Sequence, residues 1–87
     1  MHAVVIKATV TDRDALPTEL SELVPIVSDA PGFAAGYWIL LGQNQGISIL
    51  VFDTEDRASI QALATQVAGN DAATIDSVEV GEVRAQA

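Results

Sequence analysis

The amino-acid sequence predicts an α+β fold in which four strands form one antiparallel sheet and two helices cover one face of it. Two observations support this prediction. Apolar residues gather in four short runs typical of strands, and two segments between these runs have apolar residues at helical spacing instead. The predicted order is strand, helix, strand, strand, helix, strand. With 87 residues and neither a repeat nor a linker, the chain is expected to form a single domain over residues 1–87.

The first strand is expected from His2 to Val10, where even positions are apolar apart from His2 and odd positions are mixed. A polar run at positions 11–14 follows, rich in residue types that cap helix N-termini. The first helix is expected from about Asp14 to Asp29, because Pro17 suits a first turn and apolar residues recur every three or four positions. Glu19, Ser21 and Glu22 are expected mostly on its solvent side. Pro25 lies inside this pattern and should kink the helix or make its last turn irregular.

The second strand is expected from Phe33 to Leu41 and the third from Ile47 to Phe52. The polar loop between them, at positions 42–46, has a glycine at each end and is short enough for a hairpin. The last strand is expected from Ser77 to Val83. Gly81 is expected to mark a β-bulge that shifts the alternation of this strand.

The second helix is expected directly after the third strand. The run Asp53-Thr54-Glu55-Asp56 supplies an N-cap and an acidic first turn, which suits the positive end of a helix dipole. Gly69 followed by Asn70 is typical of a helix C-terminus. A narrow apolar stripe is expected along this helix, made of Ile60, Leu63, Ala64 and Val67.

This order of elements is the ferredoxin-like βαββαβ plan, in which right-handed crossovers place both helices on one face of the sheet. The usual strand order of the plan, 4-1-3-2, makes the strand Phe33 to Leu41 an edge. Three of the four apolar runs are apolar on both alternating faces, so two helices leave apolar surface uncovered. An uncharged edge strand also invites pairing with another chain. The sequence therefore predicts a homodimer, a dimeric α/β barrel, with Ile39 and Leu41 on the edge strand of the dimer.

The charge of the chain restricts its partners. Twelve acidic and four scattered basic residues give a formal net charge of −8, so neither nucleic acid nor an anionic membrane is expected as a partner. The longest apolar stretches have five or six residues, against about 20 for a membrane-spanning helix. The N-terminus has no pattern of a signal peptide, and a soluble cytoplasmic protein is expected. The absence of cysteine removes disulfides and thiolate chemistry.

Three stretches resemble the dimeric α/β-barrel proteins, and among these the antibiotic-biosynthesis-monooxygenase-like group. The stretch Leu23 to Trp38, with Ala30-Pro31-Gly32-Phe33 at its centre, is similar to the helix-to-strand junction of these proteins. The stretch Leu50 to Ala58 looks like their third strand and helix start, and Val78 to Val83 completes the resemblance. The resemblance implies the dimeric barrel. It also implies a range of roles: cofactor-independent oxygenation of quinol-like molecules, haem degradation and isomerisation, besides small proteins without a known role.

Four side chains are candidates for lining a ligand site. The haem-degrading members of the family use an Asn, a Trp and a His carried on a helix, whereas the only histidine here is His2, at the start of a strand; haem degradation is therefore not expected. His2 is either a general base near neutral pH or a residue of the frayed chain end. Tyr37 and Trp38 point to opposite faces of the sheet, and their alternation does not say which one faces a cavity. Phe52, at the end of a core strand, is either a ligand contact or core packing.

No metal site or cofactor is expected. Asp12 with Asp14, and the acidic residues of the run 53–56, do not follow the calcium-loop pattern, and helix capping explains both clusters. The sequence contains neither a phosphate loop nor a nucleophile elbow. Each specific catalytic motif that can be tested is absent, so whether the protein is an enzyme stays open.

Two functional hypotheses remain. In the first, the protein binds or oxygenates a small, apolar, aromatic molecule between sheet and helices without a cofactor, which requires a dry cavity and a group that favours deprotonation of the substrate. In the second, the protein is a non-catalytic dimeric module whose role is association or passive ligand binding.

Overall fold

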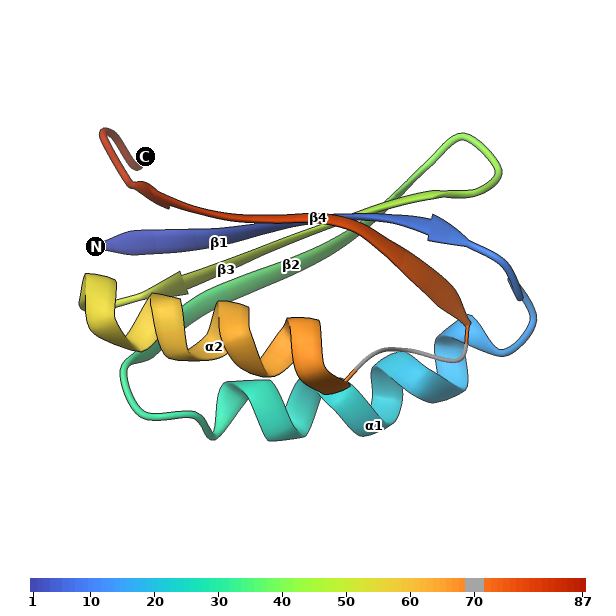
Figure 1. Ribbon diagram of the computed structural model, residues 1–87, viewed down its shortest axis with the longest axis horizontal. Coiled ribbons are helices and arrows are strands. Elements are labelled where there is room, and N and C mark those ends of the chain that lie inside the picture. The colour runs from blue at the N-terminus through green and yellow to red at the C-terminus, as the bar shows by residue number, and fades with distance from the viewer. Residues whose placement is uncertain (69–71) are drawn as a thin grey trace.

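The computed structural model describes residues 1–68 and 72–87. A single curved sheet forms one layer, and the two helices lie beneath it as a second layer (Figure 1). The strands are antiparallel and lie in the order β2-β3-β1-β4. The predicted fold class and strand order are confirmed, and β2 is an edge strand. The elements in chain order are β1 (His2–Val10), α1 (Leu16–Ser28), β2 (Phe33–Leu41), β3 (Gln45–Phe52), α2 (Glu55–Ala68) and β4 (Ala73–Glu82).

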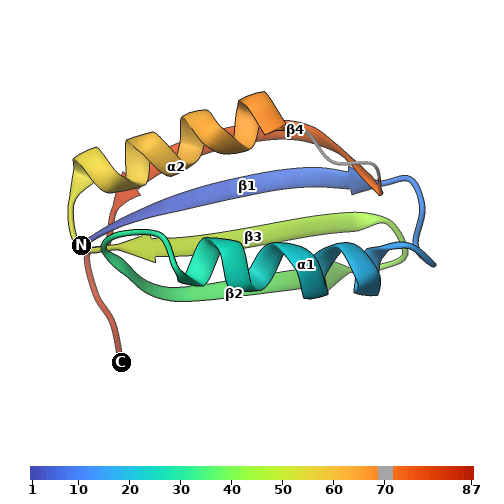
Figure 2. The same ribbon diagram turned by 90° about the horizontal axis from the view of Figure 1, so that it is seen from below.

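The two helices cover different halves of the same face of the sheet. Seen from the helix side, α1 lies over β2 and β3, and α2 lies over β1 and β4 (Figure 2). The contacts place α1 against β2, and they place α2 against β4, β1 and β3. None of the helices in the described part of the chain is long and apolar enough to cross a membrane.

The bounds of β1 and β2 are as predicted, whereas β3 and β4 both begin earlier than predicted because they stay paired with β1 to its end. The prediction of a β-bulge at Gly81 is wrong, since Gly81 pairs regularly with Ala3. The register shifts instead between Lys7 and Ala8, which leaves Asp76 of β4 without an opposite residue. The Thr9 hydroxyl donates a 2.8 Å hydrogen bond to Asp76 Oδ2, so a side-chain contact stabilises the bulge at this position.

Helix α1 is shorter at its start than predicted. Its N-cap residue is Ala15, which has no side-chain cap, and Asp12 Oδ1 accepts a 3.2 Å hydrogen bond from the Ala15 N–H instead. The helix continues through Pro25, whose carbonyl accepts a hydrogen bond from the N–H of Asp29 at 3.1 Å. The chain then tightens into a shorter turn, because the next N–H, of Ala30, bonds to the carbonyl of Val27.

The buried face of α2 is not the predicted apolar stripe. Ala58 and Ala62 are 0% and 9% exposed, while Ile60 and Leu63 are 69% and 63% exposed. Alanine on the buried side lets a helix backbone approach the sheet closely, and the larger side chains then point to solvent. Thr54 begins the helix as predicted, since its Oγ1 accepts a 3.3 Å hydrogen bond from the Arg57 N–H. The predicted C-terminal signal at positions 69–70, and the Val67 side chain, lie outside what the structure describes.

The hydrophobic core fills only one half of the space between the layers. The largest fully buried side chains are Phe52, Leu50 and Val4, and the Phe33 and Phe52 rings meet edge to face with centroids 5.8 Å apart. These residues come from the start of β1, the end of β3 and the start of β2, and they pack against the end of α1 and the start of α2. That half is on the left in Figure 1. The other half, toward the β2–β3 hairpin, contains the cavity described next.

Candidate functional site

A cavity of about 530 Å³ lies between the sheet and the two helices. All four strands and both helices contribute to its wall, which is mostly apolar. Its volume falls within the range of about 300–1,000 Å³ that small-molecule sites of proteins occupy. The fold therefore contains a space large enough for a small ligand within one chain. The large apolar residues that line it include Ile6, Val10, Leu20, Trp38, Leu50 and Ile75.

The cavity exists because small residues occupy the positions that would otherwise fill it. Ala8, Gly46, Ser48, Ala64 and Ala73 all line it. A Cβ built on Gly46 would meet nothing closer than a Val10 methyl carbon at 3.6 Å, which is ordinary contact. The two largest apolar side chains of α2 point to solvent, so they do not enter the cavity either.

Trp38 forms part of the cavity wall, and Tyr37 lies on the opposite face of the sheet. Trp38 pairs with Ser48, which also lines the cavity, and residues directly opposite each other in a sheet share a face. A Cβ on Gly36 would lie 3.0 Å from Trp38 Cη2, so the indole lies against the backbone of β2. Tyr37 pairs with Ile49 and is 56% exposed. The structure thus answers the question that strand alternation left open.

The polar groups of the cavity carry negative charge and hydrogen-bonding capacity. Glu19 and Glu22 of α1 line it, and three positions apart they lie on one side of that helix. On α2, the Thr65 hydroxyl donates a 2.9 Å hydrogen bond to the Gln61 carbonyl, and Gln61 Nε2 donates to Thr65 Oγ1 at 3.3 Å. No lysine, arginine or histidine is among the described residues that line this cavity. The sequence pattern does not point to any of these four residues, and it predicts that the two glutamates face solvent.

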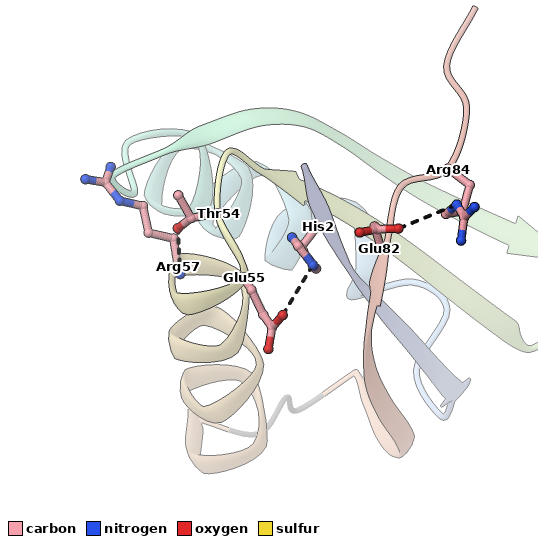
Figure 3. Close-up of polar contacts among 6 residues, drawn as sticks. All are labelled: His2, Thr54, Glu55, Arg57, Glu82 and Arg84. Atoms are coloured by element: carbon pink, nitrogen blue, oxygen red, sulfur yellow. Dashed lines mark hydrogen bonds and ion pairs between the residues drawn. The ribbon is translucent and has the colours of Figure 1, made fainter.

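His2 and Phe52 lie in the other half of the fold, away from the cavity lining. His2 Nε2 lies 3.4 Å from Glu55 Oε2, at the start of α2 (Figure 3). His2 Nδ1 is buried and has no hydrogen-bond partner among the described residues. Phe52 is 1% exposed and belongs to the core. Of the four predicted ligand-lining residues, the structure places only Trp38 on the cavity wall.

The acidic clusters at the helix starts are not arranged as a metal site. In the part of the chain that the structure describes, no group of three or more His, Cys, Asp or Glu side chains is close enough together to hold a metal ion. Each cluster instead has a local role. Asp12 caps the chain before α1, and Asp53 Oδ1 lies 3.8 Å from Arg57 Nε.

The face of the sheet opposite the helices is apolar and exposed along the edge strand β2, whereas Lys7 of β1 and Glu79 of β4 place charges on its other half. Tyr37, Ile39 and Leu41 are 56%, 42% and 45% exposed on this strand. In the register they lie opposite Ile49, Ile47 and Gln45 of β3. The apolar surface therefore extends from the edge strand onto its neighbour. We call this face the open face of the sheet.

Comparison with known proteins supports the fold. The sequence matches no protein-family model and no curated protein. Among solved structures, the chain is similar to the haem-degrader MhuD of Mycobacterium tuberculosis, solved with two haems bound in its active site. The TM-score is 0.66 and the sequence identity 19%, and the match covers 98% of each chain. The ferredoxin-like fold expected from the order of strands and helices is thereby confirmed over nearly the whole chain.

Proposed function

We propose that this protein binds a small, apolar, aromatic molecule in the cavity between its sheet and helices, without a cofactor. The observation that carries the proposal is the cavity of about 530 Å³ itself, with its apolar wall and the indole of Trp38 on that wall. Ligand sites of this kind are apolar spaces with a few convergent polar groups. Here those groups are Glu19, Ser48, Gln61 and Thr65.

Haem is a poor fit to this cavity, although the similar structure of MhuD holds two haems. Proteins hold haem iron with histidine, cysteine, methionine or tyrosine, and none of these is among the described lining residues. The propionates of haem are negatively charged, and the charged lining residues, Glu19 and Glu22, are negative as well and would repel them. A ligand smaller than haem and without carboxylates fits the wall better.

Cofactor-free oxygenation of the bound molecule is a second candidate function. The observation in its favour is the place of Glu19 on the cavity wall, because a carboxylate beside a bound phenol or quinol can accept its proton. Oxygen uptake by the protein with a naphthoquinol would support this function, provided that Glu19→Gln removes the uptake. A rate equal to that of the quinol in buffer would leave passive binding as the function.

We also propose that the protein is a homodimer in which two copies pack their open faces together. The support is the apolar character of this face along β2 and β3, and the edge position of β2, which contains no charged residue. An uncharged edge strand is a template for association unless another chain covers it. The ligand cavity lies on the opposite side of the sheet, so this dimer would leave the cavity accessible.

The binding proposal can be tested with the protein's own fluorescence, because Trp38 is the only tryptophan of the chain. Titration with 4-phenylbutanol, a neutral aromatic probe, is expected to change the Trp38 emission saturably. Ala64→Leu adds a larger side chain that fills part of the cavity from α2, and it should weaken binding. Gln66→Leu is the control, because it places the same side chain on α2 outside the lining. The absence of saturable binding by fluorescence and by calorimetry would overturn the proposal.

A further inference from the structure

We propose that the ligand of the cavity is an organic cation, with an aromatic body against the apolar wall and a protonated amine beside Glu19 and Glu22. This inference rests on the proposed function and names the chemical class of its ligand. The site is the cavity, and the two carboxylates determine which charge it accepts.

The charge of the cavity wall is the first argument. Its charged residues in the described chain are Glu19, which is half-buried, and Glu22, which is exposed. They lie one turn apart on α1 together with Leu23 and Ile26, which also line the cavity. Neither glutamate forms an ion pair with a described residue. The cavity therefore offers two carboxylates without a counter-charge beside a large apolar surface.

The basic residues of the chain do not compensate this charge. Lys7 belongs to the open face, since it pairs with Ile47 and Ser77 there. Arg57 and Arg84 lie 3.8 Å and 3.5 Å from acidic partners of their own, and the second pair is drawn in Figure 3. Arg13 precedes α1 and is not among the lining residues. An anionic ligand would therefore meet no positive side chain in the cavity, and the formal net charge of −8 would repel it further.

The indole on the wall favours the same class of ligand. An ammonium group is attracted to the face of an aromatic ring, and among the aromatic side chains tryptophan binds cations best. Trp38 lines the cavity from β2, and Glu19 and Glu22 line it from α1, the helix that lies over β2. A cation in this space can thus be stabilised by carboxylates on one side and by the indole on the other. A carboxylate ligand would be disfavoured by both.

Three probes that share one aromatic body and differ in charge test this inference. They are 4-phenylbutylamine, 4-phenylbutanol and 4-phenylbutyrate, titrated at neutral pH against Trp38 fluorescence. The amine is expected to bind at least about tenfold more tightly than the butyrate, with the alcohol between them. Added salt should narrow the difference, because it screens the partly exposed glutamates.

Two matched variants assign the preference to the cavity. The double variant Glu19→Gln, Glu22→Gln should lose the preference for the amine over the butyrate. The double variant Asp14→Asn, Asp56→Asn removes the same charge from exposed positions outside the lining and should keep the preference.

The possible outcomes separate the two proposals. If none of the three probes binds, the proposed function fails. If the alcohol binds while the amine and the butyrate bind equally, or the butyrate binds best, the function stands and the cation preference is overturned. A preference for the amine that persists in the Glu19→Gln, Glu22→Gln variant would also overturn it.

Discussion

The indole of Trp38 lies over Gly36 on the helix-facing side of β2. A Cβ on residue 36 would lie 3.0 Å from Trp38 Cη2 and 3.1 Å from Cζ3, closer than about nine in ten real Cβ contacts. The phenyl ring of Phe33 would be equally close, at 3.0 Å from its Cζ. Gly36 therefore gives the indole room to lie against the strand. From this position the Trp38 side chain lines the cavity.

Gly36→Ala is expected to displace the indole and to change the cavity. The added methyl group must move the Trp38 ring or the strand, and overpacking of this kind costs about 1–3 kcal/mol of stability. We expect a shifted Trp38 emission maximum and about five- to tenfold weaker binding of 4-phenylbutanol, which equals about 1–1.4 kcal/mol. Gly81→Ala is the control, because a Cβ there would meet nothing within 4 Å. An unchanged emission spectrum and affinity for Gly36→Ala would contradict the role assigned to Gly36.

Gly32→Ala is expected to destabilise the fold more than Gly42→Ala. Both glycines have positive φ, of 80° and 61°, so alanine at either position costs about 1 kcal/mol of backbone strain. At Gly32 the Cβ would also overlap the side chains of Asp53 and Arg57, whereas at Gly42 it would meet nothing within 4 Å. Urea unfolding should therefore show an additional loss of about 1 kcal/mol or more for Gly32→Ala. Equal losses for the two variants would show that the side chains around Gly32 move aside without cost.

Ile39→Lys combined with Leu41→Lys is expected to dissociate the proposed dimer or to unfold the chain. The two substitutions place charge on the open face of the edge strand, where charge opposes pairing with another chain. Ile60→Lys with Leu63→Lys is the control, since these side chains are at least as exposed but lie on the outside of α2. Light scattering at micromolar concentration should give a dimer mass for the native chain and for the control. A monomer mass for the native chain would contradict the dimer.

Much of the fold could be predicted because the pattern of apolar residues determines it. The runs in β1, β2 and β3 are too short and too uniformly apolar for surface helices. Gly42, with a positive φ of 61°, lies in the turn of the hairpin, whereas Gly46 is already part of β3. The bulge could not be placed, because Gly81 carries the usual signal for a bulge while the register shift at Asp76 depends on pairing with β1. Pairing of distant segments is not visible in a local sequence pattern.

The candidate site was harder to predict than the fold, because a cavity depends on positions where the side chain is too small to fill the space. Strand alternation places Tyr37 and Trp38 on opposite faces but does not identify the face that the helices cover. Glu19 and Glu22 were expected to face solvent, although a space between helix and sheet gives such residues a second surface to line. Only the packed structure shows how little of that space the neighbouring side chains fill.

The orientation of α2 leads to the last prediction. Hydrophobicity alone favours burial of Ile60 and Leu63, but the structure buries Ala58 instead, with 0% exposure. Ala58→Leu would force a larger side chain against the sheet, and we expect a loss of about 1–3 kcal/mol in the free energy of unfolding. Ile60→Ala, at a side chain that is 69% exposed, should change it by less than about 0.5 kcal/mol. Urea unfolding of both variants measures the two effects directly. The reverse result, a tolerated Ala58→Leu with a destabilising Ile60→Ala, would mean that α2 is rotated about its axis and that the cavity has a different wall.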